Sequence, residues 1–151
     1  MITQNREPKR RVLIADDDPV TRRLITSILE NKQYKVVAVE DGRQAYRLLQ
    51  TDSEFCGAIL DMRMPHLEGL DLIRYMSSEK RLMRIPVMMV TSETDLQVLT
   101  NSFAAGIKVL LPKPFTIEKL QTMLDLLLKD GSQPAVVHST NSLEIGKRRA
   151  S

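Results

Sequence analysis

Five short apolar runs alternate with segments of helical periodicity along this chain. The runs cover residues 12–15, 35–39, 58–60, 87–90 and 109–111. In the segment that follows each run, apolar residues recur at three- and four-residue spacing, which indicates an amphipathic helix. Because this alternation is typical of βα units around a parallel sheet, we predict an α/β fold with five strands.

Polar residues and glycines mark the ends of the predicted helices. Asp18 and Pro19 supply an N-cap and a proline at the first helical position. Asp41 opens the second helix, Thr116 opens the last, and Gly106 ends the fourth, as glycine does after a helix. The apolar residues predicted to face the core are Val20, Leu24, Ile25, Ile28, Leu29, Ala45, Leu48, Leu49, Leu70, Ile73, Met76, Leu96, Leu99, Phe103, Ile117, Leu120, Met123, Leu124, Leu127 and Leu128.

Four of the apolar runs are followed by polar side chains that are suited to chemistry. Asp16, Asp17 and Asp18 follow the first run, and Asp61 follows the third. Thr91 follows the fourth run, and Lys113 lies just beyond the fifth. Because the carboxyl ends of parallel strands lie along one edge of the sheet, where ligands bind, we expect these side chains to converge there.

The acidic residues of this set predict a divalent-metal site. Crowded carboxylates repel one another unless a cation neutralises them. Mg²⁺ suits such a site because it is a hard ion that prefers oxygen ligands and keeps several waters. We predict Asp17 and Asp61 as direct ligands, with Asp16 positioning a bound water. The backbone carbonyl of Arg63 is a further candidate ligand.

The same set predicts phosphoryl chemistry. Asp61 stands alone at the end of its run, so it is the natural nucleophile toward a phosphorus atom. Phosphoryl transfer needs cations that neutralise the equatorial oxygens, and Mg²⁺ together with the Lys113 ammonium provides them. Thr91 is placed to donate a hydrogen bond to a phosphoryl oxygen. Pro114, after Lys113, is a candidate for a cis peptide bond.

Over residues 10–130 the chain resembles the response-regulator receiver domains of bacterial two-component signalling, as in chemotaxis regulators. The motifs that carry the resemblance are Asp16-Asp17, Asp61-Met62-Arg63-Met64-Pro65 with Gly69, Thr91-Ser92, and Lys113-Pro114-Phe115. The resemblance implies a flavodoxin-like (βα)5 fold, a doubly wound parallel sheet of strand order 2-1-3-4-5. Because a fold alone does not establish a function, the expectation rests on the matched site residues.

The resemblance also implies a function and partners. Asp61 would accept a phosphoryl group from a sensor histidine kinase or a histidine phosphotransfer protein, with Mg²⁺ held by Asp16, Asp17 and the Arg63 carbonyl. The protein would signal through a phosphorylation-dependent protein–protein interaction of the face formed by the fourth helix, fifth strand and fifth helix, as a monomer or a phosphorylation-dependent dimer. We therefore expect a signalling phosphoacceptor and not an enzyme.

Two positions beside the site bear on switching and on the lifetime of the phosphoryl group. Family members usually carry Tyr or Phe three residues before the lysine, whereas this chain has Leu110. Leucine cannot make a tyrosyl hydrogen bond, so we expect phosphorylation capacity to survive and the switch to be weaker or to use other groups. Arg63 and Glu93 each stand two residues after a site residue, and we hypothesise that they pair across the mouth and hinder attacking water.

Composition and charge bound the remaining possibilities. The chain of 151 residues has a formal net charge of +3, but residues 12–130 carry −2 because positive charge is concentrated at both ends. A nucleic-acid-binding core would show the opposite arrangement. We predict a basic arm over 1–10, a receiver domain over 11–130 and a disordered tail or linker over 131–151. With a single cysteine, Cys56, no signal peptide and no membrane span, we expect a cytoplasmic protein.

Two other functions are compatible with part of the pattern. Asp16 to Val20 has the Asp-x-Asp-x-Val spacing of Mg²⁺-dependent phosphatases of the haloacid-dehalogenase type, with Asp16 as nucleophile. That reading lacks a later acidic pair and leaves Asp61 unexplained. A flavin or nucleotide binder would need a loop that cradles phosphate, whereas Asp16–Pro19 repels it without a metal. Residues 131–151 hold no effector domain, so both a stand-alone receiver and a fragment of a longer protein stay open.

Overall fold

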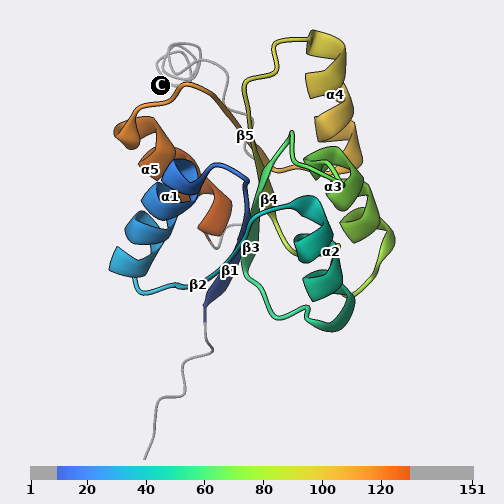
Figure 1. The fold of residues 1–151 in the computed structure, drawn as a ribbon, viewed down its shortest axis with the longest axis horizontal. Helices are drawn as coiled ribbons and strands as arrows, with labels where there is room; N and C mark the ends of the chain where they lie inside the picture. The colour runs from blue at the N-terminus through green and yellow to red at the C-terminus, as the bar shows by residue number, and fades with distance from the viewer. Residues whose placement is uncertain (1–9, 130–151) are drawn as a thin grey trace, which may run out of the picture.

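The computed structural model describes residues 10–129 and arranges them as a parallel five-stranded sheet between two layers of helices (Figure 1). The strands are β1 (Arg11–Ala15), β2 (Lys35–Val39), β3 (Gly57–Asp61), β4 (Val87–Thr91) and β5 (Val109–Pro112). The helices are α1 (Pro19–Asn31), α2 (Gly42–Thr51), α3 (Gly69–Ser78), α4 (Leu96–Ala105) and α5 (Ile117–Leu128). The sheet order β2-β1-β3-β4-β5 confirms the predicted flavodoxin-like fold.

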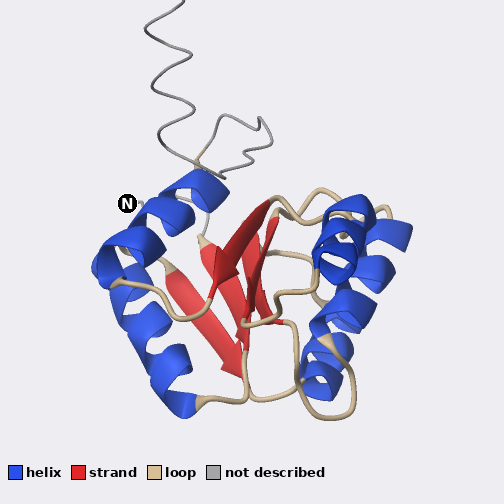
Figure 2. Cartoon of the chain, turned by 90° about the horizontal axis from the view of Figure 1, so that it is seen from above, coloured by secondary structure: helices blue, strands red, loops and turns tan. Residues whose placement is uncertain are grey.

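Helices cover both faces of the sheet, and this explains why its central strands are apolar between their end residues. The helices α1 and α5 lie on one face, and α2, α3 and α4 lie on the other (Figure 2). Side chains alternate along each strand, so Leu13 and Leu60 join the core beneath α2 and α3. Ile14 and Ile59 join the second core, beneath α1 and α5. Burial on both faces is typical of parallel sheets.

The strand register brings the carboxyl ends of the strands together. Ala15 lies opposite Leu60, the residue before Asp61. Asp61 lies opposite Val90, the residue before Thr91. Thr91 in turn lies opposite Pro112, the residue before Lys113. The backbone therefore places the polar residues that end β1, β3, β4 and β5 along one edge of the sheet.

The predicted helix ends are confirmed. The Asp18 carboxylate caps α1 by accepting hydrogen bonds from the backbone N–H of Val20 (3.1 Å) and the hydroxyl of Thr21 (2.6 Å). Asp41 caps α2 and Thr116 caps α5 in the same way. Gly106 ends α4 with a φ of +123°, a left-handed value that favours glycine. The peptide bond between Lys113 and Pro114 is cis.

Three residues predicted to face the core are instead exposed. The exposed fractions are 64% for Val20, 77% for Leu96 and 54% for Ile117. Each lies in the first turn of its helix, at the end that follows the carboxyl end of a strand. Periodicity identified the apolar face of each helix correctly but not the point along the helix at which the core ends. Cys56 precedes β3, as expected for the residue before a strand, but it is exposed.

Parts of the predicted domain organisation lie outside the described residues. The predicted tail, residues 131–151, lies beyond them, as does the predicted arm, residues 1–10, apart from Arg10. Within residues 10–129, no helix is both long enough and apolar enough to cross a membrane.

Candidate metal and phosphoacceptor site

Three carboxylates meet at the carboxyl edge of the sheet. Asp16 and Asp17 follow β1, and Asp61 ends the neighbouring strand β3. One oxygen atom from each of these residues lies within 4.8 Å of the others. Asp16 and Asp61 are buried, whereas Asp17 is exposed. The predicted convergence of these side chains is therefore observed, with one side of the cluster open to solvent.

Lys113 and Thr91 complete the set that the sequence placed at this edge. The Lys113 ammonium nitrogen lies 3.9 Å from a carboxylate oxygen of Asp61. The backbone N–H of Lys113 donates a hydrogen bond to the carbonyl of Thr91 (2.7 Å), which ties the lysine to the end of β4. Thr91 itself is buried. Residues that follow β1 and β5 thus lie beside the Asp61 carboxylate, and Thr91 ends the strand next to β3.

The electrostatics of the cluster are unfavourable without a cation. Burial, with the charge of Asp16 as the second cause, raises the pKa of Asp61 to about 7 against the opposing effect of Lys113. Burial also raises the pKa of Asp16, although the backbone N–H of Asp18 and the charge of Lys113 lower it. One lysine therefore does not compensate for the buried acids, and a divalent cation would.

The donor set fits Mg²⁺. All three converging side chains offer carboxylate oxygens, the ligands that this hard cation prefers, and the exposed side of Asp17 leaves room for retained waters. Arg63 lies two residues after Asp61, and its backbone N–H donates to an Asp61 carboxylate oxygen (3.3 Å). Its carbonyl stays a predicted ligand.

In the metal-free protein, we expect the free energy of unfolding to fall as the pH rises from about 4 to above about 7. The pKa of Asp61 is raised from 3.8 to about 7 in the folded protein, so the folded state holds the proton more tightly than the unfolded chain does. The resulting stabilisation is complete below the unfolded pKa and is lost as the pH passes through the folded pKa.

Urea denaturation in a chelator, repeated across this pH range, checks the expectation. Asp61→Asn removes the titrating group, so it should be more stable than the parent by about 1–3 kcal/mol near pH ~8 and lose that advantage near pH ~4. Parallel stability profiles for the two proteins would show that Asp61 does not titrate in this way.

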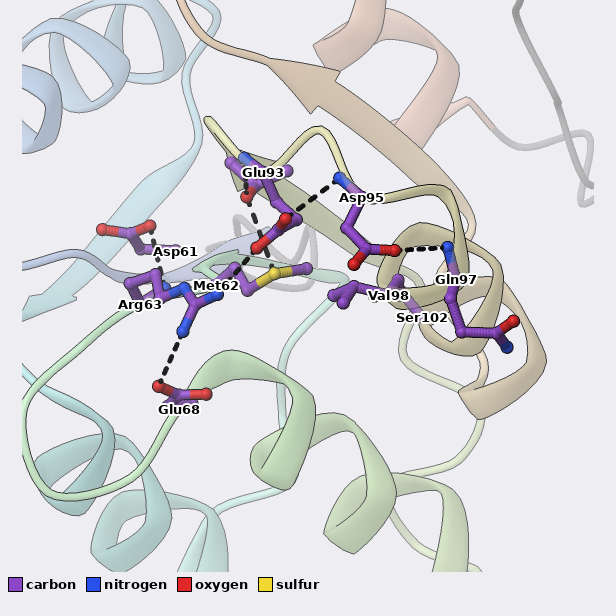
Figure 3. A network of polar contacts seen from close by, with 10 residues as sticks. Asp61, Met62, Arg63, Glu68, Glu93, Asp95, Gln97, Val98 and Ser102 are labelled. Atoms are coloured by element: carbon purple, nitrogen blue, oxygen red, sulfur yellow. Dashed lines mark hydrogen bonds and ion pairs between the residues drawn. The ribbon is translucent and has the colours of Figure 1, made fainter.

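An ion pair joins two of the loops beside the site. The Arg63 guanidinium lies 2.7 Å from a carboxylate oxygen of Glu93, which joins the β3–α3 loop to the β4–α4 loop (Figure 3). A second carboxylate, that of Glu68, lies 3.5 Å from the same guanidinium. The pairing of Arg63 with Glu93 was predicted from their spacing, whereas the contact with Glu68 was not. The N–H of Asp95 and the Arg63 side chain lower the pKa of Glu93, so it stays ionised.

The Thr91 hydroxyl is engaged in two contacts. It accepts a hydrogen bond from the backbone N–H of Glu93 (2.8 Å) and donates to the sulfur of Met62 (3.6 Å). Nothing in its spacing distinguishes Met62 from the other apolar residues of the loop, so the sequence predicts no role for it. Only the fold brings its sulfur against the end of β4.

Leu110 lies in β5 opposite Met89. It is half-buried and packs against the core on the side of α2, α3 and α4. The position predicted for a switch thus holds an aliphatic side chain that has no polar group to offer.

Comparison with known proteins agrees with the geometry of the site. Residues 12–125 match the family model described as the response regulator receiver domain. The chain is 31% identical over 119 residues to the chemotaxis protein CheY1 of Helicobacter pylori, which covers 78% of this chain and 96% of the relative. The match therefore covers most of the described domain and almost the whole length of that relative.

Solved structures agree as well. The chemotaxis response regulator CheY4 of Vibrio cholerae is similar with a TM-score of 0.72 and 28% identity, over 79% of this chain and 98% of that one. The receiver domain of the sensor histidine kinase PA1611 of Pseudomonas aeruginosa was solved with a magnesium ion in its active-site cleft. It is similar with a TM-score of 0.69 and 28% identity, over 79% of this chain and 97% of that one. Fold, converging site residues and family match lead to one conclusion: the chain belongs to the response regulator receiver domain family and is a phosphoacceptor of two-component signalling.

Proposed function

We propose that Asp61 is the phosphoacceptor and that the reaction depends on Mg²⁺. The observation that carries the proposal is the position of Asp61, whose buried carboxylate lies between two further acids and the Lys113 ammonium. An acidic metal site next to a nucleophilic carboxylate and a cation is what phosphoryl transfer requires. The phosphatase alternative uses Asp16 as the nucleophile and leaves Asp61 without a function.

The chemistry follows from these residues. A carboxylate oxygen of Asp61 attacks the phosphorus of a phosphohistidine, an acyl phosphate forms, and the phosphorus–nitrogen bond breaks with the electron pair returning to the imidazole. Asp16, Asp17, Asp61 and the Arg63 carbonyl would hold Mg²⁺, which neutralises charge on the phosphoryl oxygens when bound. Lys113 supplies a second positive charge, and Thr91 donates a hydrogen bond to a phosphoryl oxygen once its hydroxyl is released.

The experiment that tests the proposal is phosphorylation by a small donor. Acetyl phosphate with Mg²⁺ should transfer one phosphoryl group to the protein, and a chelator should prevent the transfer. Support for the metal comes from the acidic cluster and from the magnesium-bound receiver domain of the Pseudomonas aeruginosa kinase, which this chain resembles. A chain that is modified equally well in the presence of the chelator would contradict the Mg²⁺ requirement.

The natural donor, by this proposal, is a sensor histidine kinase or a histidine phosphotransfer protein, and the protein acts in the cytoplasm. It signals by binding a protein partner and not nucleic acid, as a monomer or a phosphorylation-dependent dimer, with no catalytic activity beyond its own phosphorylation and dephosphorylation. The output surface is the face formed by α4, β5 and α5, on which Leu96 and Ile117 are exposed. Because Leu110 has no hydroxyl, signal transmission relies on other groups of that face.

We expect Arg63→Ala to shorten the life of the acyl phosphate. By this proposal, the ion pair between Arg63 and Glu93, which joins two loops beside the site, hinders water from reaching the phosphorus. Since an ion pair with one exposed partner at the surface contributes up to about 1 kcal/mol, its loss should speed dephosphorylation about two- to fivefold. The decay of the phosphorylated protein, followed by intact-protein mass spectrometry, measures this rate.

Glu93→Gln, which removes the other partner, should have an effect in the same direction. Arg74→Ala, at an exposed position on α3, is the matched control and should decay at the parent rate. The idea fails if Arg63→Ala and Arg74→Ala decay at the same rate.

A further inference from the structure

Thr91 carries a buried hydroxyl group that must find hydrogen-bond partners inside the protein. Both Thr91 and Met62 have exposed fractions of 2%, so water does not solvate the contact between them. Buried polar groups are almost always hydrogen-bonded, because an unsatisfied donor loses its hydration without compensation. The partners of this hydroxyl therefore determine where it rests.

Both hydrogen-bonding functions of the hydroxyl are in use. Its oxygen accepts from the backbone N–H of Glu93 at 2.8 Å, and its proton is directed at the Met62 sulfur at 3.6 Å. Within residues 10–129, the sulfur is the one acceptor to which this hydroxyl donates. To donate to a phosphoryl oxygen on Asp61, the hydroxyl has to give up the sulfur.

We infer that Met62 is a positioning residue whose sulfur holds the Thr91 hydroxyl in its resting position and competes with the phosphoryl group for the same proton. This inference rests on the proposed function, since it assumes a phosphoryl group on Asp61. Met62 directly follows Asp61, so the residue that restrains the hydroxyl is the chain neighbour of the residue that attracts it.

A thioether suits this role better than the alternatives. Sulfur is a weak acceptor, so it satisfies the hydroxyl at rest and releases it readily to a charged phosphoryl oxygen, which forms a stronger hydrogen bond. An amide or carboxylate here would retain the hydroxyl, and an aliphatic side chain would leave it unsatisfied. Leu110, in the strand next to Thr91, offers no competing polar group.

The test replaces the sulfur and keeps the volume. Met62→Leu exchanges residues of similar size, and Met76→Leu is its matched control because both methionines have exposed fractions of 2% and belong to the same core. Beryllofluoride, which mimics a phosphoryl group on a carboxylate, is titrated in Mg²⁺. We expect Met62→Leu to bind it about two- to fivefold more tightly than the parent, the effect of losing one weak hydrogen bond in the resting state only. Met76→Leu should bind as the parent does.

A second pair of variants separates this effect from repacking of the core. In a Thr91→Val background there is no hydroxyl to hold, so adding Met62→Leu should leave the affinity unchanged. A gain that persists in that background would overturn the inference, as would Met62→Leu binding no more tightly than Met76→Leu. If the parent protein binds no beryllofluoride, the proposed function fails and the inference fails with it. If the parent binds beryllofluoride and Met62→Leu binds it with the same affinity, only the inference about Met62 is overturned.

Discussion

Asp61→Asn is expected to abolish Mg²⁺-dependent phosphorylation by acetyl phosphate. The amide keeps the shape of the side chain but is not a nucleophile. Asp61 is also the member of the acidic cluster that lies 3.9 Å from the Lys113 ammonium nitrogen. Loss of a nucleophile lowers the rate by more than about 100-fold. Incorporation of a phosphoryl group, followed by intact-protein mass spectrometry, is the measurement.

Two controls make this result specific. Asp125→Asn changes an exposed aspartate of α5 that pairs with Lys32, so it should be phosphorylated as the parent is. Asp61→Asn should be at least as stable as the parent near neutral pH, because it removes a carboxylate whose burial is unfavourable in the metal-free protein. Substantial phosphorylation of a folded Asp61→Asn protein would show that the acceptor is another residue.

Gly69→Ala, a substitution next to the site, is expected to cause a large loss of stability. A Cβ atom at Gly69 would lie 2.5 Å from the carbonyl oxygen of Asp61 and 3.0 Å from the sulfur of Met89. The methionine can adjust, but the Asp61 carbonyl belongs to the backbone at the end of β3 and cannot move without displacing the acceptor. We therefore expect the free energy of unfolding to fall by about 1–3 kcal/mol, despite the helix preference of alanine over glycine.

Urea denaturation measures this loss, with Arg74→Ala as the control for an exposed position of the same helix. Because the clash displaces the backbone that carries Asp61, the folded fraction of Gly69→Ala should also be phosphorylated more slowly. A Gly69→Ala protein as stable as the parent would mean that α3 can move away from β3 without cost.

Much of the fold could be predicted because its signals are local. The alternation of apolar runs with helical periodicity identified all five strands, and the caps at Asp18, Asp41 and Thr116 located helix starts. The convergence of Asp16, Asp17 and Asp61 followed from one rule, that parallel strands end at the same edge. The exposure of Leu96 was missed because periodicity gives the direction of a side chain but not the extent of the sheet beneath it.

Contacts between loops were harder to predict. The pairing of Arg63 with Glu93 could be predicted because each residue stands two positions after the end of its strand. The second partner of Arg63, Glu68, depends on how the β3–α3 loop turns back to start α3. The contact of Met62 with Thr91 depends on where a long, flexible side chain comes to rest. Such details have no signature in residue spacing.

The central claim is that Asp61, and not Asp16, receives the phosphoryl group. The most direct test treats the full chain with acetyl phosphate and Mg²⁺, reduces the acyl phosphate with borohydride to fix its position, and maps the modified residue by peptide mass spectrometry. Our account predicts a single modified residue, Asp61. Modification of Asp16, which the phosphatase alternative requires, would contradict it.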